Sequence, residues 1–486
     1  EGYDPDNNVR EDARASALEE FRSFVEEAHS RDIKVCIDFV INHCGRHHEM
    51  FQNTIGAEGD FTPEGWTYSS IESWNEDSKY FDWFNRTTSP NSTDDGTVVD
   101  PAPAPTGFSG LRVMPEWNYN NVAAREHILA TADFLSNDVG IDAFRCDIAY
   151  GVPHSFWKEV RDVVRSNDSD FMMLDETIPN DPDFAENEFG VHFDTADFMK
   201  TAGHGVVNGG DPMQLYDAVA KRKREGWPDH TLLMNTTENH DEQRLYKVAR
   251  DGTREDPAKA QRAVWAAGVT LPGVPFIYYG QEHLITEHGH QRYDFDGSGE
   301  DGRTGDVSST VYKRSFMNWA DNGDEVPEDH LEFYQNVTQF YKDNEILHPH
   351  VDAQKTWFQS DDSVLVFGRS METDDGEQNV VVMVHFDPGT AQIDLLPGTE
   401  TTDMFTGEDI SVDTDSEGVS LEFDTLAVVE TDTLFSVGEK IAEFDEPTGD
   451  DTGPGSYTYP TGDAYNDGAF DISAMSVHTN AEAVQF

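Results

Sequence analysis

Basic residues are scarce in this chain of 486 residues, where 33 lysines and arginines stand against 95 acidic residues and the formal net charge is −62. Nucleic acids and anionic membranes attract positively charged proteins, so this balance argues against both as partners. A disordered acidic chain would be poor in aromatic residues, but this sequence has 30 Phe, 16 Tyr and 9 Trp. We therefore expect a folded protein whose acidic surface needs salt to screen its self-repulsion, as in proteins of high-salt organisms.

Cysteines and long apolar runs are scarce as well. The three cysteines, Cys36, Cys44 and Cys146, are an odd number and give no disulfide framework. No apolar stretch approaches the roughly 20 residues of a membrane-spanning helix, and no signal peptide is visible. The first residue is Glu1 and not Met, so we expect the chain to begin inside a domain.

Stretches with strand and helix periodicity alternate along most of the chain. Strands are predicted at residues 34–41, 140–147, 171–176, 192–198, 232–234 and 274–280, and helices at 16–30, 122–136, 155–164, 212–224, 257–267 and 328–344. Such alternation predicts βαβ units and a parallel sheet. We expect a (β/α)8 TIM barrel; because six strands are counted and not eight, its first two strand–helix units are expected to be missing.

The remaining segments predict further domains. Residues 44–118 lack regular patterning and are too long for an ordinary connection, which predicts an inserted subdomain within a barrel that occupies residues 1–345. Short strands between turn residues then predict a C-terminal antiparallel β-sandwich over 346–440. Residues 441–486 are predicted to hold a linker, rich in Pro, Gly and Asp, and the start of a truncated further β-module.

Three carboxylates each lie at or just past the end of one of the predicted strands: Asp147, Glu176 and Asp241. In a (β/α)8 barrel the active site lies at the carboxyl ends of the strands, so an acid there indicates catalysis. Retaining hydrolysis of a glycosidic bond needs a nucleophilic carboxylate and a protonated partner. A single acid at a strand end is more often a cap or a turn residue, but an ordered set of three favours a sugar-cleaving barrel.

The motifs around these acids resemble those of the α-amylase superfamily, glycoside hydrolase family 13, in the family's order. They are Asp38-Phe39-Val40-Ile41-Asn42-His43, Met114-Pro115-Glu116-Trp117-Asn118-Tyr119, Phe144-Arg145-Cys146-Asp147, Asp175-Glu176, Glu238-Asn239-His240-Asp241 and the segment 272–282. The opening Gly2-Tyr3-Asp4 is similar to the turn after the family's second strand, and the resemblance extends to about residue 440.

The resemblance implies a role for each catalytic acid. Asp147 would be the nucleophile that forms a β-glycosyl-enzyme, and Glu176 would protonate the leaving oxygen and later deprotonate water. Asp241 would bind sugar hydroxyls and stabilise the distorted, oxocarbenium-like state. Arg145 shares a strand face with Asp147 and would keep this nucleophile ionised.

The same resemblance implies substrate-binding and metal-binding residues. His43 and His240 would bind hydroxyls of the sugar that is cleaved, and Tyr3 would stack on its apolar face. A structural calcium ion would use Asn42 and an acidic loop residue, Glu116, where the family usually has Asp. The resemblance implies no organic cofactor.

One departure concerns the segment after the nucleophile. Many amylases of the family have a Lys-His pair there, but this chain has Tyr150-Gly151, which weakens the case for calcium and for one substrate contact. Residues 145–157 are also similar to those of cyclomaltodextrinases and neopullulanases.

The sequence therefore predicts a retaining hydrolase of α-1,4-glucosidic bonds in starch-like α-glucans, most simply an endo-acting α-amylase from a salt-adapted organism. One alternative is a cyclomaltodextrinase- or neopullulanase-type maltodextrin hydrolase or transglycosylase. The other is a non-catalytic sugar-binding relative, a group that has lost acids of the triad.

An α-glucan or maltodextrin is the expected partner; no nucleic acid or membrane insertion is expected, and the sequence does not predict an oligomeric state. The C-terminal module and the acidic surface favour an extracellular protein, with the cytoplasm of a high-salt organism as the alternative.

Overall fold

The computed structural model of the protein describes residues 11–59, 69–228, 230–285, 317, 319, 326–354, 363–374, 376–394, 399–413, 420–432, 434, 439–445, 474–479 and 484–485. Two compact units divide the chain. The first comprises residues 1–350 with 386–388, and the second comprises 351–385 with 389–486. Each unit has its own core, and each is described here by itself.

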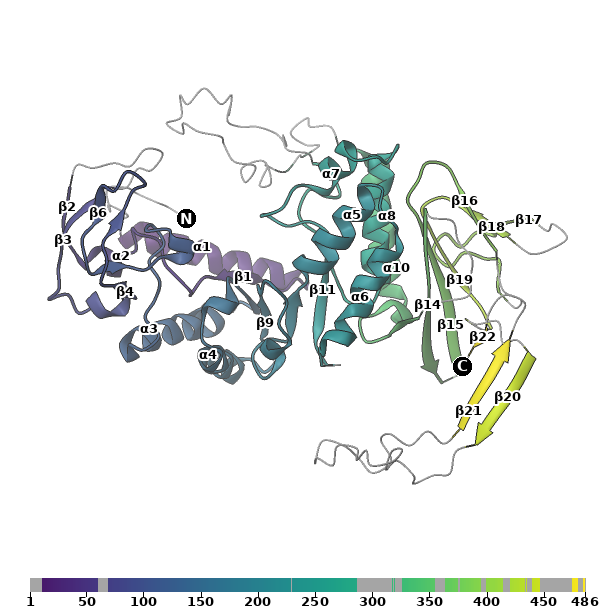
Figure 1. Ribbon diagram of the computed structural model, residues 1–486, viewed down its shortest axis with the longest axis horizontal. Coiled ribbons are helices and arrows are strands. Elements are labelled where there is room, and N and C mark those ends of the chain that lie inside the picture. Colours follow the sequence, from purple (N-terminus) through teal and green to yellow (C-terminus); the bar gives the residue numbers. More distant parts are fainter. Residues whose placement is uncertain are drawn as a thin grey trace. The chain divides into compact units, whose positions relative to one another are not determined.

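A six-stranded parallel sheet organises the described part of the first unit, in the order β1-β8-β9-β10-β11-β12. Figure 1 labels three of its strands, β1, β9 and β11. Its strands are β1 (Cys36–Phe39), β8 (Ala143–Cys146), β9 (Met172–Asp175), β10 (Val191–Phe193), β11 (Leu232–Thr236) and β12 (Val274–Phe276). The helices between and around them are α1 (Glu11–Ser30), α3 (Val122–Asp133), α4 (His154–Asn167), α5 (His204–Val207), α6 (Met213–Glu225), α7 (Leu245–Asp251), α8 (Pro257–Thr270) and α10 (Glu328–Asp343). The predicted alternation of strands and helices, and the six strands, are confirmed.

Local sequence signals explain where several of these helices begin and end. Asp256 caps α8, because its side chain accepts a hydrogen bond from the Lys259 amide at 3.0 Å, and Pro257 occupies the first helical position, where no amide is needed. At the other end of α6, Gly226 adopts φ 87°, a left-handed conformation that glycine takes without steric cost. Helix starts and stops of this kind leave short connections to the next strand.

One predicted strand is shorter than expected. Residues 192–198 were expected to be extended, but β10 ends at Phe193 and a π-helical segment, η6 (Thr195–Gly203), follows. The cause is Asp194, whose side chain accepts hydrogen bonds from the amides of Asp197 and Phe198 at 3.2 and 3.3 Å. This capping starts a helix where the apolar pattern alone suggested a strand.

The segment between β1 and α3 forms small two-stranded sheets, β2-β3, β4-β7 and β5-β6. Its elements are α2 (Glu49–Gln52), β2 (Ile55–Glu58), β3 (Ile71–Trp74), η1 (Phe81–Trp83), β4 (Arg86–Thr87), β5 (Asn91–Ser92), β6 (Val98–Asp100), β7 (Ala104–Pro105) and η2 (Phe108–Gly110). The two ends of the segment pair with each other through a bridge between His43 and Glu116. A long excursion therefore leaves the sheet after β1 and returns to the same place.

Large apolar side chains fill the region between the sheet and its helices. Phe144 of β8 stacks on Phe39 of β1, with ring centroids 4.2 Å apart, and Phe171 meets Phe144 at 5.0 Å. Trp157 of α4 is fully buried in the same cluster. Burial of these aromatic rings stabilises the packing of the strands. Because all neighbouring strands pair in parallel, their carboxyl ends lie at one edge of the sheet.

Two antiparallel sheets make up most of the described part of the second unit, in the orders β13-β14-β15-β19 and β16-β18-β17. The strands are β13 (Ala353–Gln354), β14 (Val364–Thr373), β15 (Gly376–His385), β16 (Ala391–Asp394), β17 (Ser411–Asp413), β18 (Ser420–Phe423) and β19 (Leu426–Glu430). A common core of buried residues from both sheets, including Val366, Met383, Ile393 and Phe423, identifies a sandwich. The predicted C-terminal antiparallel fold is confirmed.

The end of the chain contributes a further three-stranded sheet, β20 (Glu439–Asp445), β21 (Ala474–Thr479) and β22 (Val484–Gln485). The predicted linker falls largely on residues 446–473, which lie outside the described residues. The division of the last 46 residues into linker and module therefore stays a prediction.

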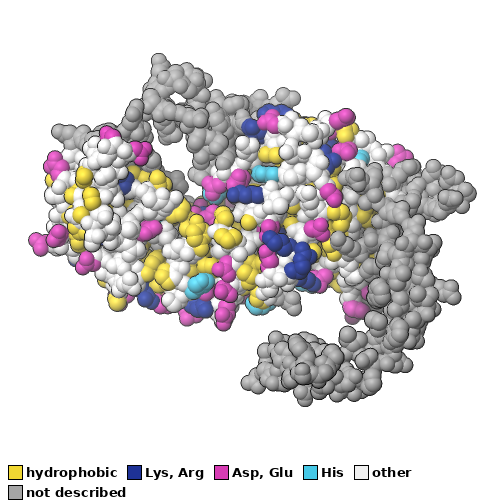
Figure 2. All heavy atoms as spheres, viewed as in Figure 1, with side chains coloured by type: hydrophobic (Ala, Val, Ile, Leu, Met, Phe, Trp, Pro, Cys, Tyr) yellow, Lys and Arg dark blue, Asp and Glu magenta, His cyan; other side chains and the backbone are white. Residues whose placement is uncertain are grey.

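On the face that Figure 2 shows, acidic side chains are scattered over the described part of the molecule, and basic ones appear in a few places. Of the described helices, none is long and apolar enough to cross a membrane. All three cysteines are free thiols.

Candidate active site

Asp147 lies immediately after β8, and Arg145 precedes it by two residues on the same strand face. The Arg145 guanidinium donates from Nη1 to Asp147 Oδ1 at 2.6 Å. Both side chains are mostly buried, with 11 and 19 % of their surfaces exposed. A positively charged guanidinium is therefore in direct contact with the candidate nucleophile.

Glu176 lies immediately after the neighbouring strand β9 and shares the same guanidinium. Arg145 Nη2 is 2.8 Å from Glu176 Oε2, and the Ile148 amide donates to that oxygen at 3.1 Å. Because one guanidinium contacts both acids, the Asp147 and Glu176 carboxyl groups are close neighbours at the edge of the sheet. The predicted pairing of strand-end acids is therefore present in the structure.

The environment of Glu176 differs from that of Asp147. Burial raises the pKa of Glu176, and the negative charges of Asp147 and Asp241 act in the same direction, whereas Arg145 and the Ile148 amide oppose them. Burial disfavours the charged form of a carboxyl group. Two neighbouring acids with different surroundings can thus hold different protonation states, as acid catalysis beside a nucleophile requires.

Asp241 lies on the loop that follows β11. Its amide and that of Glu242 donate to Asn239 Oδ1 at 3.0 and 2.8 Å, and His240 Nε2 is 3.3 Å from Asp241 Oδ2. Asp241 is also near enough to Glu176 to raise its pKa. The loop therefore brings Asp241 and His240 to the same edge as the other two acids.

His43 joins this group from the loop after β1. Burial lowers the pKa of His43, and the charges of Asp147 and Glu116 act against that shift. Its ring stacks on Phe108, with centroids 5.2 Å apart. Of the predicted sugar-binding residues, Arg145, His43 and His240 thus lie around the three acids, while Tyr3 lies outside the described residues.

Asp38 contacts Arg145 in the structure, although the sequence analysis gave Asp38 no role in the site. It stands opposite Arg145 in the register of β1 and β8, and its Oδ1 accepts from Arg145 Nη1 at 3.1 Å. A third acid therefore holds the guanidinium that pairs with Asp147 and Glu176. The motif containing Asp38 was recognised, but its partner depends on strand register, which the sequence alone does not fix.

A second missed feature lies behind Glu176. Asp175 points away from the acids, as alternation along β9 requires, and its Oδ2 accepts from Thr177 Oγ1 at 2.9 Å and lies 3.0 Å from His192 Nδ1. His192 stands opposite Asp175 in the register of β10 and β9 and packs on Trp227 at 4.5 Å. These buried contacts fix the end of β9, from which Glu176 projects.

The predicted calcium ligands are adjacent but already have partners. Asn42 Nδ2 donates to the Gly151 carbonyl at 2.9 Å, and Asn42 Oδ1, the atom that would bind calcium, lies 3.3 Å from His43 Nδ1. Glu116 Oε2 accepts from Thr106 Oγ1 at 2.9 Å. Calcium takes six to eight oxygen ligands, and the described residues contain no group of three or more acidic, histidine or cysteine side chains placed to hold a metal. These side chains alone do not compose a calcium shell, and calcium stays a prediction.

The absence of a side chain at Gly151 explains how Asn42 can hydrogen-bond to the backbone there. A Cβ at Gly151 would come within 2.4 Å of Asn42 Nδ2, a contact that real Cβ atoms do not make. The glycine therefore permits the backbone approach that engages the Asn42 amide. A larger residue at this position would need a different Asn42 orientation.

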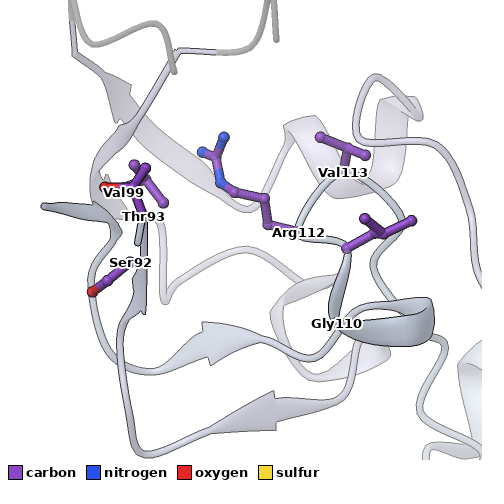
Figure 3. Close-up of a pocket in the computed structure, with 7 residues that line it drawn as sticks. Ser92, Thr93, Val99, Gly110, Arg112 and Val113 are labelled. Carbon is purple, nitrogen blue, oxygen red and sulfur yellow. The ribbon is translucent and has the colours of Figure 1, made fainter. Parts of the chain in front are cut away.

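A cavity of about 160 Å³ lies in the segment between β1 and α3 (Figure 3). The residues that Figure 3 labels around it are Ser92, Thr93, Val99, Gly110, Arg112 and Val113. Arg112 is engaged with Asp100, with Nη2 2.8 Å from Oδ1. None of the predicted site residues lines this cavity, so the cavity is not part of the candidate active site.

The fold and the site together define an α/β protein with an acidic site at the carboxyl edge of a parallel sheet. Residues 1–360 match the family model of the α-amylase catalytic domain, and residues 441–486 match the model of the C-terminal, SLH-like binding module of glucodextranase. The chain therefore belongs to the α-amylase family.

Curated relatives come from several branches of this family. The chain is 34 % identical over 268 residues to α-amylase MalA of Haloarcula japonica, which covers 54 % of this chain and 33 % of that protein. It is 27 % identical over 285 residues to a cyclomaltodextrinase of a Bacillus species, covering 58 % and 46 %. The chain thus spans between a third and about half of the length of these relatives.

Solved structures have the same fold at lower identity. A cyclomaltodextrinase structure aligns with a TM-score of 0.65 at 21 % identity, covering 85 % of this chain and 63 % of that one. An Anoxybacillus α-amylase aligns with a TM-score of 0.63 at 21 % identity, covering 86 % and 80 %. At this identity the likeness concerns the fold alone.

Proposed function

We propose that this protein is a retaining glycoside hydrolase that cleaves α-1,4-glucosidic bonds in starch-like α-glucans, and that it acts as an endo-acting α-amylase. One observation carries the proposal: a single guanidinium, that of Arg145, contacts both Asp147 at 2.6 Å and Glu176 at 2.8 Å. Two neighbouring carboxyl groups at the carboxyl edge of a parallel sheet are what retaining hydrolysis requires.

In the proposed first step, an Asp147 oxygen attacks the anomeric carbon while Glu176 gives its proton to the glycosidic oxygen. The bond to the leaving sugar breaks, and a β-glycosyl ester forms on Asp147. Arg145 places a positive charge 2.6 Å from the attacking Asp147 carboxylate, and burial keeps Glu176 available as an acid because it raises the pKa of Glu176. The environments of the two acids thus match the two roles.

In the second step, Glu176 takes a proton from a water molecule that attacks the ester and releases the sugar with its original α configuration. Asp241 binds hydroxyls of the distorted sugar in both steps, and His43 and His240 bind the same sugar. His43 suits this task because burial lowers its pKa and a neutral ring can both donate and accept a hydrogen bond.

A cyclomaltodextrinase- or neopullulanase-type activity is the second candidate. It is supported by the similarity to the Bacillus cyclomaltodextrinase and to neopullulanase 2 of Thermoactinomyces vulgaris, which is 28 % identical over 285 residues. A non-catalytic role is disfavoured, because all three acids are present.

Product profiles of the full-length protein on soluble starch, cyclodextrin, pullulan and maltotriose test the proposal. An endo-acting α-amylase lowers the viscosity and iodine staining of starch before much reducing sugar accumulates, whereas a cyclomaltodextrinase consumes cyclodextrin faster than starch. Proton NMR of the first product distinguishes retention, which releases the α anomer, from inversion. Release of the β anomer, or no hydrolysis of any glucan, would contradict the proposed mechanism.

Localisation and metal content are separate proposals. We propose secretion, which the match to a binding module at residues 441–486 supports; however, an intracellular maltogenic amylase of Bacillus subtilis is also similar, at 26 % identity. Fractionation of the source cells would separate the two compartments. A structural calcium at Asn42 and Glu116 predicts that a chelator lowers the melting temperature.

A further inference from the structure

The loop that carries Asp241 is closed at its base by one buried carboxylate. Glu238 is fully buried, and its two oxygens contact the far end of the loop. Oε2 accepts from Arg244 Nη1 at 2.8 Å, and Oε1 accepts from the Leu245 amide at 2.6 Å. Glu238, the second residue of the loop, is thus tied to Arg244, its last residue, and to the start of α7, and Asp241 lies between them.

The same base is anchored to two other elements. On one side, Gln261 of α8 donates from Nε2 to Glu238 Oε1 at 3.1 Å. On the other, Arg244 donates from Nη2 to the Tyr279 carbonyl at 2.9 Å, and its guanidinium lies over the rings of Tyr278 and Tyr279, 4.4 and 5.0 Å from their centroids. The pair therefore locates the loop relative to both α8 and the segment after β12.

Within the loop, Asn239 transmits this position to its tip. The Asn239 side-chain oxygen accepts from the amides of Asp241 and Glu242, which fixes the backbone of Asp241 three residues from Glu238 of the anchored base. The Asp241 side chain is still 46 % exposed and can reach a substrate. A rigid base thus supports an accessible carboxylate.

A buried ion pair of this kind is poorly explained by stability alone. Desolvation of both charges costs about as much as their attraction returns, and apolar replacements of such pairs are often neutral or stabilising. Buried pairs do impose geometry, because only one arrangement satisfies their hydrogen bonds. Arg244 and Glu238 are 1 and 0 % exposed, so water offers no alternative partner.

We propose that Glu238 and Arg244 are positioning residues that act through Asp241, and this role rests on the proposed hydrolytic function. The pair holds the Asp241 carboxylate where the distorted sugar presents its hydroxyls. Loss of the pair leaves the carboxylate present but displaced. A displacement of about 1 Å at a reacting centre can cost about 100-fold in rate.

A double-mutant cycle in the full-length protein tests this proposal. Arg244→Met preserves much of the side-chain volume but removes the ion pair, and it should lower kcat on an α-glucan about 100-fold with little change in KM. In an Asp241→Asn background, the same substitution should lower the residual kcat less than about 3-fold, because the positioned group is already lost. An equal loss in both backgrounds would overturn the proposal and leave only a structural role.

A matched control is Arg46→Met. Arg46 is also fully buried and paired with a buried acid, Asp100, at 3.3 Å, but it lies in the segment between β1 and α3. This variant should lose stability without a comparable loss of kcat. If Arg244→Met does not fold, Glu238→Gln replaces it in the cycle; because it keeps an acceptor oxygen for the Leu245 amide, we expect a loss of about 10-fold.

Hydrogen exchange gives a readout that does not depend on activity. The Asp241 and Glu242 amides should exchange at least about 10-fold faster in Arg244→Met or Glu238→Gln than in the wild type, and unchanged in Arg46→Met. If the wild type hydrolyses no glucan, the proposed function fails, and this exchange pattern still tests whether the pair holds the loop. Unchanged exchange would overturn the positioning role whatever the activity.

Discussion

Asp147 and Glu176 are placed by strands, whereas Asp241 is placed by a loop. The first two acids come directly after β8 and β9, whose register pairs Cys146 with Asp175, and one guanidinium contacts both of them. Asp241 comes five residues after the end of β11 and depends on a buried network of side chains. A parallel sheet positions residues at its edge through its backbone, but a residue further out needs a support of its own.

The first prediction concerns the strand-held nucleophile. Asp147→Asn retains the shape of the side chain and its place after β8 but removes the charge that attacks the sugar. We expect kcat on soluble starch to fall about 10⁴-fold or more, as for other residues of a catalytic unit, with the fold intact by circular dichroism. Asp170→Asn is the matched control, because Asp170 is exposed at the opposite end of β9; retained hydrolysis in Asp147→Asn would refute the mechanism.

The second prediction concerns the strand-held acid. Glu176→Gln cannot protonate the leaving oxygen, and general acid catalysis contributes about 10²–10⁴-fold, so starch hydrolysis should fall by about 10³-fold. Substrates with an activated aryl leaving group need less protonation and should lose much less. Rates on both substrates, compared with those of the exposed control Glu186→Gln, would check this. An equal loss on both substrates would assign Glu176 another role.

The third prediction concerns the guanidinium that joins the two strand-held acids. Arg145 lowers the pKa of Glu176 and thus opposes the effect of burial. Arg145→Met should therefore raise that pKa further. Because the acid must be protonated to act, the basic limb of the pH profile of kcat/KM should move to higher pH, together with a loss of about 10²-fold in kcat from misplaced acids.

The control for this shift is Arg125→Met, which breaks the partly exposed pair with Glu159 on α3 and α4 and should leave the profile unchanged. A basic limb that moves to lower pH in Arg145→Met would show that Glu176 does not set it. The strand-held pair would then lack the electrostatic coupling that distinguishes it from the loop-held acid.

The difference between the two regions also explains what the sequence could predict. The six strands and the acids after them follow from apolar runs and from the rule that parallel strands share one carboxyl edge. The contact between Asp38 and Arg145 was missed because it needs the register of β1 and β8. The expected strand at 192–198 was too long, because capping by Asp194 ends it after Phe193.

The support of Asp241 was less predictable still. Glu238 belongs to a recognised motif, but its partners include Gln261 and, through Arg244, Tyr279. These residues are 23 and 35 positions away in the chain from the groups they contact, and no local pattern connects them. Side-chain networks that join several elements depend on tertiary packing, which sequence periodicity does not encode.

The last prediction concerns His43, whose position depends on a strand and on a second segment. It follows β1, but its ring stacks on Phe108 from η2. His43→Phe keeps an aromatic ring for this stacking and removes both ring nitrogens. Loss of a neutral hydrogen bond to the sugar corresponds to about 10-fold in affinity, so KM should rise by about that factor with kcat nearly unchanged. Burial lowers the pKa of His43, so the ring is neutral at and above about pH 7 and the rise in KM should not vary with pH there.

His47→Phe, at an exposed neighbouring position, serves as the control. If kcat falls in His43→Phe as strongly as in Glu176→Gln, His43 takes part in the chemistry. The segment between β1 and α3, which packs on His43 through Phe108, would then position a catalytic residue, in addition to the strands and the loop after β11.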